Sequence, residues 1–493
     1  MKTFFVAALP LALLLTAPQS DFAATLPQLA KGGVVSLRVT VQEFDESLPW
    51  NKRPERVTAG SALVLREKLL LTTADMVRNA TLIEVRKRGR YPDYRAEAVV
   101  VDYEVDLALL KVDAPGFWSD LTPLPISGTP ARSGRFEINR WRNGGRFEQG
   151  TGEMVEIRVA TSRFGTLELP LLRGSTGMTG LGWAEVLTLN GAVIGIVTGH
   201  GEQGLHAAPG PVLRRFIAGL KQDGSIGFAH RGFTWQRLNQ TAMRRSFGLT
   251  GNSAGVLVRR VYGGGTGTEM LKEGDILIRI GENTIDPEGQ IDHPLYGQIL
   301  FTIALNDTLE KTTPATVIRN GKLMEIQLHR TQFGAEDYRI HPYEFDRPAD
   351  FEVFGGLVVQ ELSLDYLRQW GADWQKKAPA RLVIEYALNA LRGKGETNEK
   401  VLIVTKVLSD PVNLGYEEVT NAILVRVNGR TPASLDEFRS ALRRPSNGFH
   451  TIEIKPGQGR GTLVFAAEEI EEANRRIRQI YGVSPSVHQV SGR

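Results

Sequence analysis

Short apolar runs broken by glycine, proline and asparagine make up most of the first half of the chain. Between about Leu29 and Leu220 the strand-like runs are VVSLRVTVQEF, SALVLREKLLLTT, TLIEVRKRG, AEAVVVDYEVDLALLKV, VEIRVATS and AEVLTLNGAVIGIVTG. Many short strands at close spacing are typical of an all-β barrel or sandwich. The Asn190-Gly191 pair between β-rich flanks predicts a tight hairpin.

The pattern changes after about Phe228, where strands alternate with short helical segments. The run GVLVRRVYGGGTGTEMLKEGDILIRIGENTI indicates a strand, a glycine loop, a short helix and a strand pair. A third unit, from about Phe351 to Ala466, contains the helical stretch PARLVIEYALNALRG. Both units contain a strand followed by a turn, at Gly281 and at Asn428-Gly429, which is a weak internal repeat.

The segments 221–227 and 339–348 are the predicted linkers between these units. The tail from Glu468 to Ile480 has Ile470, Ala473 and Ile477 at helical spacing, so we expect a helix that docks on a neighbouring element.

Length and charge narrow the function classes. The chain has 493 residues, enough for about three domains. Its net charge of +4 comes without any block of like charge, which argues against a nucleic-acid partner. It contains no cysteine, which excludes disulfides and thiolate metal sites.

The first 24 residues, MKTFFVAALPLALLLTAPQSDFAA, combine one lysine, a short apolar run and small residues at Ala23 and Ala24. This pattern predicts a secretory signal peptide cleaved near Ala24. The apolar run is too short to cross a bilayer comfortably, and no later segment is long and apolar enough. We therefore expect an exported, periplasmic protein without a membrane span in its mature form.

Three motifs follow one another in an order known from one protease family. TTADMV (72–77) resembles T-N-A-H-V-V, and DLALLKV (106–112) matches D-L-A-L-L-K-V. RGSTGMTG (173–180) stands where P-G-N-S-G-G-P is expected, and VIGIVTG and HAAPGPVLRRFI follow it. Through these motifs nearly all of the mature chain resembles the Deg/HtrA family. The plant-type Deg proteases are most similar in their sequence pattern.

The resemblance implies a mainly β protein with α+β modules, namely a trypsin-like double β-barrel followed by two PDZ domains. The implied domains are a degenerate protease domain, a first PDZ domain, a second PDZ domain with a helical insertion, and a C-terminal helix and tail, at 29–222, 228–332, 348–467 and 468–493. It also implies a homo-oligomer built from trimers. The catalytic positions carry over to Asp75, Asp106 and Thr176.

These three residues do not form a working triad by chemistry. Asp75 replaces the histidine that would act as general base, and a carboxylate with a reference pKa of about 3.9 is too weak a base for an alcohol at neutral pH. If Asp75 approaches Asp106, their charges repel, so one carboxyl should hold a proton or turn toward solvent. Thr176 carries a methyl group that crowds its hydroxyl. Ser175 is an out-of-register alternative without a base.

The surrounding loop also departs from the family pattern. Gly174 and Gly177 match it, whereas Arg173, Met178 and Thr179 do not, which puts the oxyanion hole in doubt. His200 and His206 lie outside the base position in the resemblance, and we expect them to be polar residues near strand ends. A metal site at the two aspartates lacks further ligands, so no metal and no cofactor is expected.

The first PDZ unit provides the positive functional signal. PDZ domains bind an extended peptide as an added strand and capture its terminal carboxylate with backbone N–H groups. We expect the carboxylate loop at Phe247, Gly248 and Leu249 and the peptide-binding strand to include Val256 and Val258. The second PDZ unit resembles modules that serve packing and assembly.

The sequence therefore predicts an exported Deg/HtrA-like pseudoprotease that binds peptides or unfolded proteins with free C-termini and scaffolds envelope proteins. Two alternatives remain: an active serine-type endopeptidase with a divergent site, and a regulatory subunit that assembles with an active Deg paralogue.

Overall fold

The structure of the protein is a computed structural model. It describes residues 30–201, 204–221, 227–249, 255–262, 270–330, 332–333, 337–391, 399–456 and 461–484. The predicted signal peptide lies outside these residues. No helix in the described part of the chain has the length and apolar character needed to cross a membrane.

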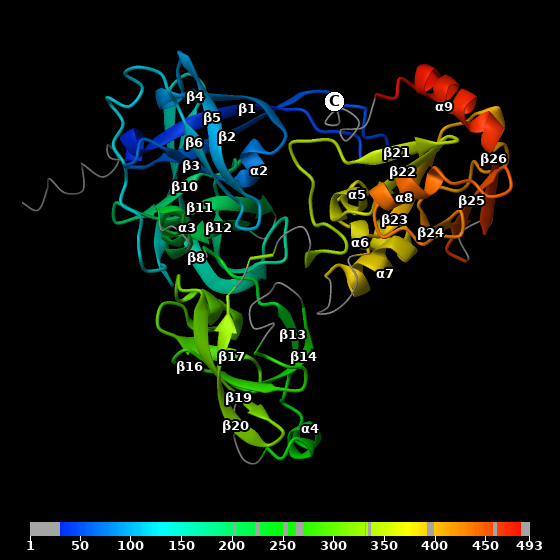
Figure 1. The fold of residues 1–493 in the computed structure, drawn as a ribbon. Helices are drawn as coiled ribbons and strands as arrows, with labels where there is room; N and C mark the ends of the chain where they lie inside the picture. The colour runs from blue at the N-terminus through cyan, green and yellow to red at the C-terminus, as the bar shows by residue number, and fades with distance from the viewer. Residues whose placement is uncertain are drawn as a thin grey trace, which may run out of the picture.

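Two closed six-stranded barrels form the N-terminal half (Figure 1). The first has the strand order β1-β2-β3-β6-β5-β4, with the one-turn helix α2 (Ala74–Val77) between β3 and β4. Its strands are β1 (Val34–Val41), β2 (Arg56–Val64), β3 (Leu70–Thr72), β4 (Ala80–Arg86), β5 (Asp93–Asp102) and β6 (Leu107–Lys111). The 3-10 turn η1 (Lys87–Gly89) joins β4 to β5.

The second barrel has the order β10-β11-β12-β9-β8-β7, and helix α3 (Gly210–Lys221) packs against β11 and β12. Its strands are β7 (Arg135–Arg142), β8 (Arg146–Thr161), β9 (Glu168–Thr176), β10 (Val186–Leu189), β11 (Ala192–Gly201) and β12 (Gly204–Pro209). Asn190 and Gly191 both have positive φ and join β10 to β11, so the predicted hairpin is confirmed. Leu63 and Leu107 of the first barrel share one buried cluster with Val186 and Ile196 of the second.

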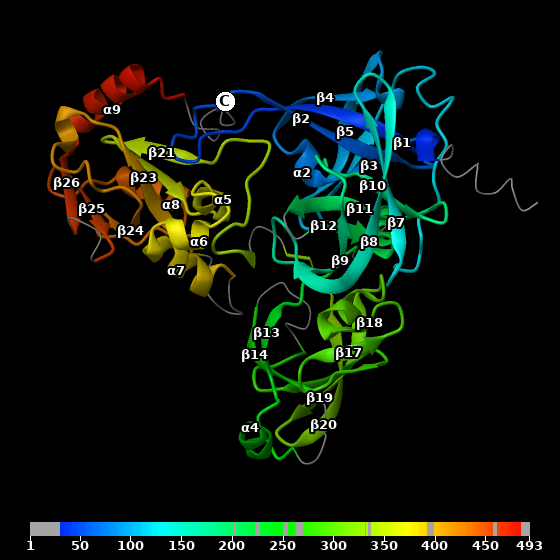
Figure 2. The same cartoon turned by 180° about the vertical axis from the view of Figure 1, so that it is seen from behind.

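The third unit is a sheet of the order β13-β14-β15-β19-β20, with β16 beside β15 (Figure 2). Its strands are β13 (Phe233–Arg237), β14 (Val256–Val261), β15 (Ile276–Ile280), β16 (Asn283–Thr284), β19 (Thr312–Arg319) and β20 (Lys322–His329). The hairpin β17 (Gln290–His293) and β18 (Gly297–Leu300), the 3-10 helix η2 (Phe301–Asn306) and helix α4 (Thr241–Ser246) complete it. Its core is a cluster centred on Phe233, Phe301 and Leu277.

The fourth unit is a six-stranded sheet in sequence order from β21 to β26. Its strands are β21 (Phe351–Phe354), β22 (Leu357–Glu361), β23 (Leu402–Val407), β24 (Ala422–Val427), β25 (Phe449–Ile454) and β26 (Thr462–Ala466). Its helices are α5 (Leu364–Arg368), α6 (Trp374–Lys377), α7 (Ala380–Asn389), η4 (Pro411–Asn413), α8 (Leu435–Leu442) and α9 (Ala467–Tyr481). The insertion α5–α7 between β22 and β23 and the inward residues Ile470, Ala473 and Ile477 of α9 agree with the predicted helices.

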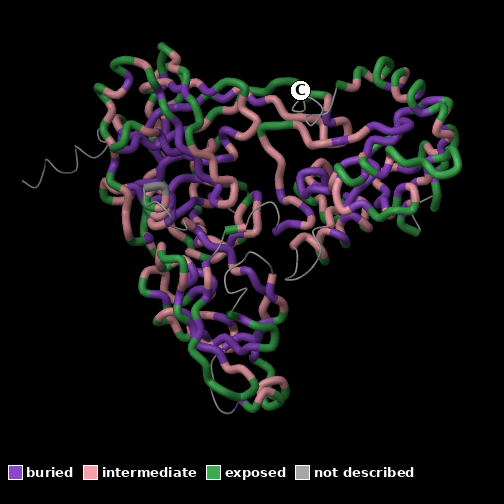
Figure 3. Tube along the Cα trace, viewed as in Figure 1, coloured by how far each residue is buried: buried purple, intermediate pink, exposed green. Residues whose placement is uncertain are grey.

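The long segment between β1 and β2 leaves the first barrel and reaches the fourth unit, as the blue stretch in Figure 1 shows. Leu48 and Trp50 pack with Phe351 and Ile477. The indole N–H of Trp50 donates to the carbonyl of Tyr481 at 3.3 Å. The β1–β2 segment therefore connects the first and fourth units. Buried residues, purple in Figure 3, lie in both barrels and in both sheets.

Candidate functional site

Asp75 and Asp106 meet between the two barrels, as the sequence predicts. Asp75 lies on α2, where Ala74, Met76 and Val77 are buried and fix the helix against the barrel. Asp106 precedes β6 with a φ of 57°, a backbone conformation that aspartate tolerates better than most residues. The backbone N–H of Asp75 donates to Oδ1 of Asp106 at 2.8 Å.

The two carboxylates avoid each other. The side chain of Asp75 turns to Arg78, whose Nε lies 2.7 Å from Oδ1, and to Arg163, whose guanidinium lies 3.4 Å from Oδ2. Oδ2 of Asp106 is buried and has no hydrogen-bond partner. Burial, together with the charge of Asp75, raises the pKa of Asp106 to about 7. The expected turn toward solvent is not seen, because Asp75 faces two arginines and its side chain is 7% exposed. The raised pKa of Asp106 agrees with the expectation that one acid holds a proton.

This raised pKa has a consequence for stability. The folded pKa of Asp106 lies above its unfolded value, so its stabilising contribution is present below the unfolded pKa and is lost as pH rises to about 7. We expect Asp106→Asn, which keeps an acceptor for the N–H of Asp75, to flatten the fall in unfolding free energy between about pH 4 and 7 by up to about 1.4 kcal/mol per pH unit. Urea unfolding at several pH values measures this slope. An unchanged slope would contradict a buried, protonated Asp106.

Thr176 is not brought together with these acids. It ends β9, where its Oγ1 donates to the carbonyl of Thr151 at 2.6 Å and accepts from the N–H of Met178 at 3.1 Å. Ser175 pairs with Glu153 on β8 and is exposed. In the described part of the chain, the carboxylate of Asp75 contacts no serine or threonine hydroxyl. The prediction that Thr176 stands at the nucleophile position is therefore corrected.

The segment that approaches α2 is 180–185, just before β10. It was not predicted from the sequence. The N–H of Ser61 donates to the carbonyl of Trp183 at 3.0 Å, and Gly60 bridges to Trp183. The guanidinium of Arg163 stacks 4.5 Å from the ring of Trp183, and the ring of His200 lies 5.6 Å from it. Neither Gly182 nor Trp183 carries a nucleophile. Counting back from the Asn190-Gly191 hairpin would have indicated this segment.

The backbone N–H of Gly182 in this segment is already used. The N–H of Gly182 donates to Oε1 of Glu185 at 2.8 Å, and Arg140 donates to the same oxygen at 2.7 Å. Arg140 also binds the carbonyl of Gly180 at 2.6 Å. The side chains of Arg140 and Glu185 are only 5% and 2% exposed. An oxyanion hole needs free N–H donors aimed at developing negative charge. Here a buried carboxylate occupies the N–H of Gly182.

A cavity of about 310 Å³ lies beside Asp106 between β8, β9, β11 and β12. Its polar lining includes Arg158, Arg163, Thr198 and His206 around Asp106. Burial, and then the charges of Arg158 and Arg173, lower the pKa of His206, so its imidazole is neutral near pH 7. The walls are largely apolar, formed by Val105, Ala160, Leu169, Pro170, Leu171, Ala208 and Val212. Such a cavity can bind a side chain.

The predicted carboxylate loop has no free amides. The N–H groups of Phe247 and Leu249 both donate to the carbonyl of Arg244, and that of Gly248 donates to Arg245. Gly248 has a φ of 71°, so the three residues cap the C-terminus of α4. The predicted role of this loop in binding a terminal carboxylate is therefore corrected.

The predicted peptide-binding strand is also internal to its sheet. β14 pairs with β13 on one side and with β15 on the other, and the side chains of Val256 and Val258 are 0% and 1% exposed in the core. The outer strand is β13, which pairs with no second strand in the described part of the chain. Trp235 of β13 packs against Phe301, which holds this strand on the core. An added strand therefore has an edge at β13 and not at β14.

No group of three or more metal-ligating side chains occurs within the described residues.

Comparison with known proteins shows what these features are similar to. The PDZ domain family matches residues 340–487, which cover the fourth unit. Protease Do-like 2, chloroplastic, from Arabidopsis thaliana is 25% identical over 463 residues, 91% of this chain and 74% of the relative. Putative protease Do-like 3, mitochondrial, from the same plant is 24% identical over 401 residues, 77% of this chain and 66% of the relative. The chain thus spans about two thirds to three quarters of the length of these relatives.

Among solved structures, an HtrA-type protease AlgW with a decapeptide is 19% identical, with a TM-score of 0.46 over 64% of this chain and 99% of that chain. The double barrel, the two later sheets and the sequence matches agree on one assignment. The protein is a mainly β homologue of the Deg/HtrA-type proteases and carries a PDZ domain.

Proposed function

We propose that the protein is an inactive Deg/HtrA homologue, a pseudoprotease, that binds extended peptide segments. The observation that carries this proposal is the pair Asp75 and Asp106. Arg78 and Arg163 hold the carboxylate of Asp75, and Oδ2 of Asp106 has no partner. In an active serine protease an imidazole would use that oxygen and take a proton from a hydroxyl. Asp75 supplies no such ring and contacts no hydroxyl.

Two features support peptide binding. The outer edge of β13 offers backbone groups to an added strand, which is the way PDZ domains hold peptides. The cavity beside Asp106 can take one side chain of a bound segment. Export to the periplasm after cleavage near Ala24, scaffolding of envelope proteins and assembly into trimers are parts of the proposal that rest on the sequence and its resemblance.

The peptide proposal gives a testable prediction for the full-length protein. A fluorescent, extended peptide with alternating apolar side chains should bind and should protect the amides of β13 from hydrogen exchange. N-methylation of every other peptide residue removes the main-chain donors of one edge, so we expect at least a tenfold loss of affinity, which fluorescence anisotropy measures. Amidation of the C-terminus should leave affinity unchanged, because the amides of Phe247, Gly248 and Leu249 already bind carbonyl groups.

The other outer strand of the same sheet, β20, is the internal control and should gain no protection. Equal affinity for the methylated and unmethylated peptides, or protection at β20 in place of β13, would contradict the proposed site.

A further inference from the structure

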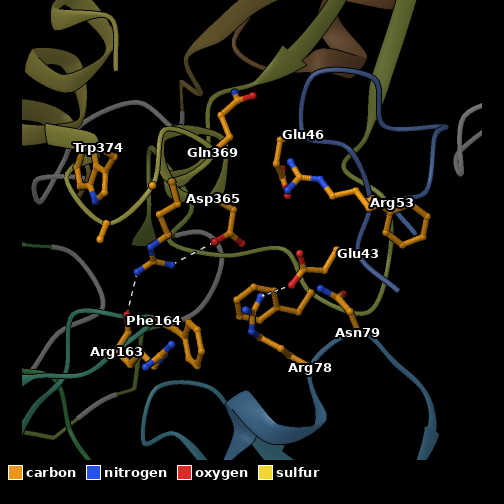
Figure 4. Close-up of a pocket in the computed structure, with 15 residues that line it drawn as sticks. Glu43, Glu46, Arg53, Arg78, Asn79, Arg163, Phe164, Asp365, Gln369 and Trp374 are labelled. Atoms are coloured by element: carbon orange, nitrogen blue, oxygen red, sulfur yellow. Dashed lines mark hydrogen bonds and ion pairs between the residues drawn. The ribbon is translucent and has the colours of Figure 1, made fainter. Parts of the chain in front are cut away.

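A second cavity, of about 500 Å³, lies between the two barrels and the PDZ domain (Figure 4), and no residue of β13 is in its lining. We call it the interdomain pocket. Five segments line it: the β1–β2 segment with Arg53 and Glu46, the end of α2 with Arg78, the β8–β9 turn with Arg163, the linker before β21 with Phe345, and the PDZ insertion with Arg368, Gln369 and Trp374. Its size suits a small molecule or a few residues of a peptide.

Direct contacts between the two domains fix its walls. Arg368 of α5 donates to the carbonyl of Arg163 at 2.8 Å and contacts Asp365 at 3.1 Å. Asn79 and Asp346 exchange two hydrogen bonds of 2.7 Å through backbone N–H and side-chain oxygen groups. The pocket is therefore held on both sides by hydrogen bonds, so that a ligand would meet a preformed site.

The cations that line the pocket are unequally paired. Arg78 binds Asp75 and also lies 3.3 Å from Glu43. Arg163 has one ion pair, at 3.4 Å, and 40% of its side chain is exposed. The guanidinium of Arg53 has no hydrogen bond or ion pair to any residue that the structure describes. The guanidinium of Arg163 also stacks on Trp183, so Arg53 is the guanidinium group with capacity for a further acceptor in this pocket.

Neutral donors in the lining are also left over. Nε2 of Gln369 is buried and has no partner, although its Oε1 accepts from Ser47 at 3.0 Å. The indole N–H of Trp374 donates to no group in the described chain. Nε2 of Gln369 is closed off from a ligand in the pocket, whereas the half-buried indole of Trp374 can donate to one.

The acidic side chains of the lining do not neutralise the unpaired guanidinium of Arg53. Glu43 is held by Arg56 at 2.8 Å, and Asp365 accepts from the N–H of Glu344 at 3.0 Å in addition to its bond with Arg368. Glu46 is the remaining acid.

The titration of Glu46 depends on its surroundings from three elements. Burial, and then the charges of Asp365 on α5, Glu344 in the linker and Asp45 beside it, raise the pKa of Glu46 to about 8, against the opposing charge of Arg53. Glu46 is therefore mainly a neutral carboxylic acid at pH 7. It adds no negative charge there and can donate a hydrogen bond.

We propose that the interdomain pocket binds a ligand through a carboxylate, which the guanidinium of Arg53 holds. Guanidinium groups match the planar carboxylate with paired hydrogen bonds. Figure 4 shows Glu46 and Arg53 entering from the N-terminal segment, with Trp374 on the opposite side. The carboxylate can come from an acidic side chain of a peptide or from a free organic acid.

The test is calorimetric titration of the full-length protein with two probes: a hexapeptide of alternating glutamate and alanine with both ends blocked, and citrate. We expect at least one probe to bind, and Arg53→Ala to weaken it about tenfold. Arg66→Ala, an exposed arginine outside the pocket, is the matched control and should bind as the unchanged protein does. Arginine-dependent binding of the peptide alone assigns a peptide source, and of citrate alone a free acid.

The pH dependence gives a second, independent readout. A bound carboxylate favours the protonated form of Glu46, so affinity should rise as pH falls from 9 to 7. Glu46→Gln should remove this dependence and keep tight binding at pH 9. No binding of either probe, or equal binding by Arg53→Ala and the unchanged protein, would overturn the proposal. Because the blocked peptide is acidic and carries no alternating bulky apolar residues, this outcome is separate from the result at β13.

Discussion

Neither the protein nor its Asp75→His, Thr176→Ser double variant is expected to react with a serine-directed phosphonate probe. Loss of the base or of the nucleophile alone costs a serine protease about a millionfold in kcat. The double variant would place an imidazole beside the free Oδ2 of Asp106, but the residue at position 176 would still bond to β8 at Thr151. The base and the hydroxyl would therefore remain unconnected.

The oxyanion position gives a second reason to expect no reaction with the phosphonate probe. The N–H of Gly182 would still donate to Glu185, so negative charge developing on a substrate would meet a carboxylate. Mass spectrometry of the intact chain detects the phosphonate adduct, and an active serine protease labelled in parallel is the control. Labelling of the double variant at residue 176 would show that the site can still be assembled, and the correction at Thr176 would then be wrong.

Arg140→Leu is expected to lower the free energy of unfolding of the second barrel by about 3–5 kcal/mol. The side chains of Arg140 and Glu185 are 5% and 2% exposed, and Oε2 of Glu185 is already without a partner. Removal of the arginine leaves a buried, uncompensated carboxylate. Hydrogen exchange of the β10 amides measures this loss apart from the other domains.

The matched control lies on the same strand. Arg135 of β7 pairs with Glu153, and their side chains are 82% and 64% exposed, so Arg135→Leu should cost less than about 1 kcal/mol. The Arg140→Leu, Glu185→Leu double variant should recover part of the loss, because it buries no charge. Equal costs at Arg140 and Arg135 would contradict the view that a buried ion pair fills the oxyanion position.

Local patterns predicted much of this fold. The Asn190-Gly191 pair marks a hairpin because both residues tolerate positive φ, and the spacing of Ile470, Ala473 and Ile477 places them on one face of α9. The motifs around Asp75 and Asp106 follow strands of the first barrel and bring the two acids into contact. Each of these features depends on residues close together in the sequence or on one barrel.

The errors arose where long-range pairing decides the outcome. Two glycine-containing stretches precede β10: 173–180, which begins inside β9, and 180–185. Only the pairing of β10 with β7 and β11 shows which one approaches α2. The Phe247-Gly248-Leu249 stretch has the composition of an anion-binding loop, but its amides cap a helix. That β14 is internal follows from its pairing with β13, about 20 residues earlier, which the sequence pattern does not reveal.

The interdomain pocket could not be predicted for the same reason. Arg53 and Trp374 are separated by more than 300 residues and line one cavity because the β1–β2 segment docks on the PDZ domain. The sequence shows no periodicity or spacing that connects them.

The most direct test of the inactive site is incubation of the purified full-length protein with casein, followed by mass spectrometry of the products. We predict no cleavage above the background of a mock purification, because no imidazole connects Asp106 to a hydroxyl. Steady cleavage that persists through further purification and is lost on Asp106→Asn or Thr176→Ala would contradict the pseudoprotease account.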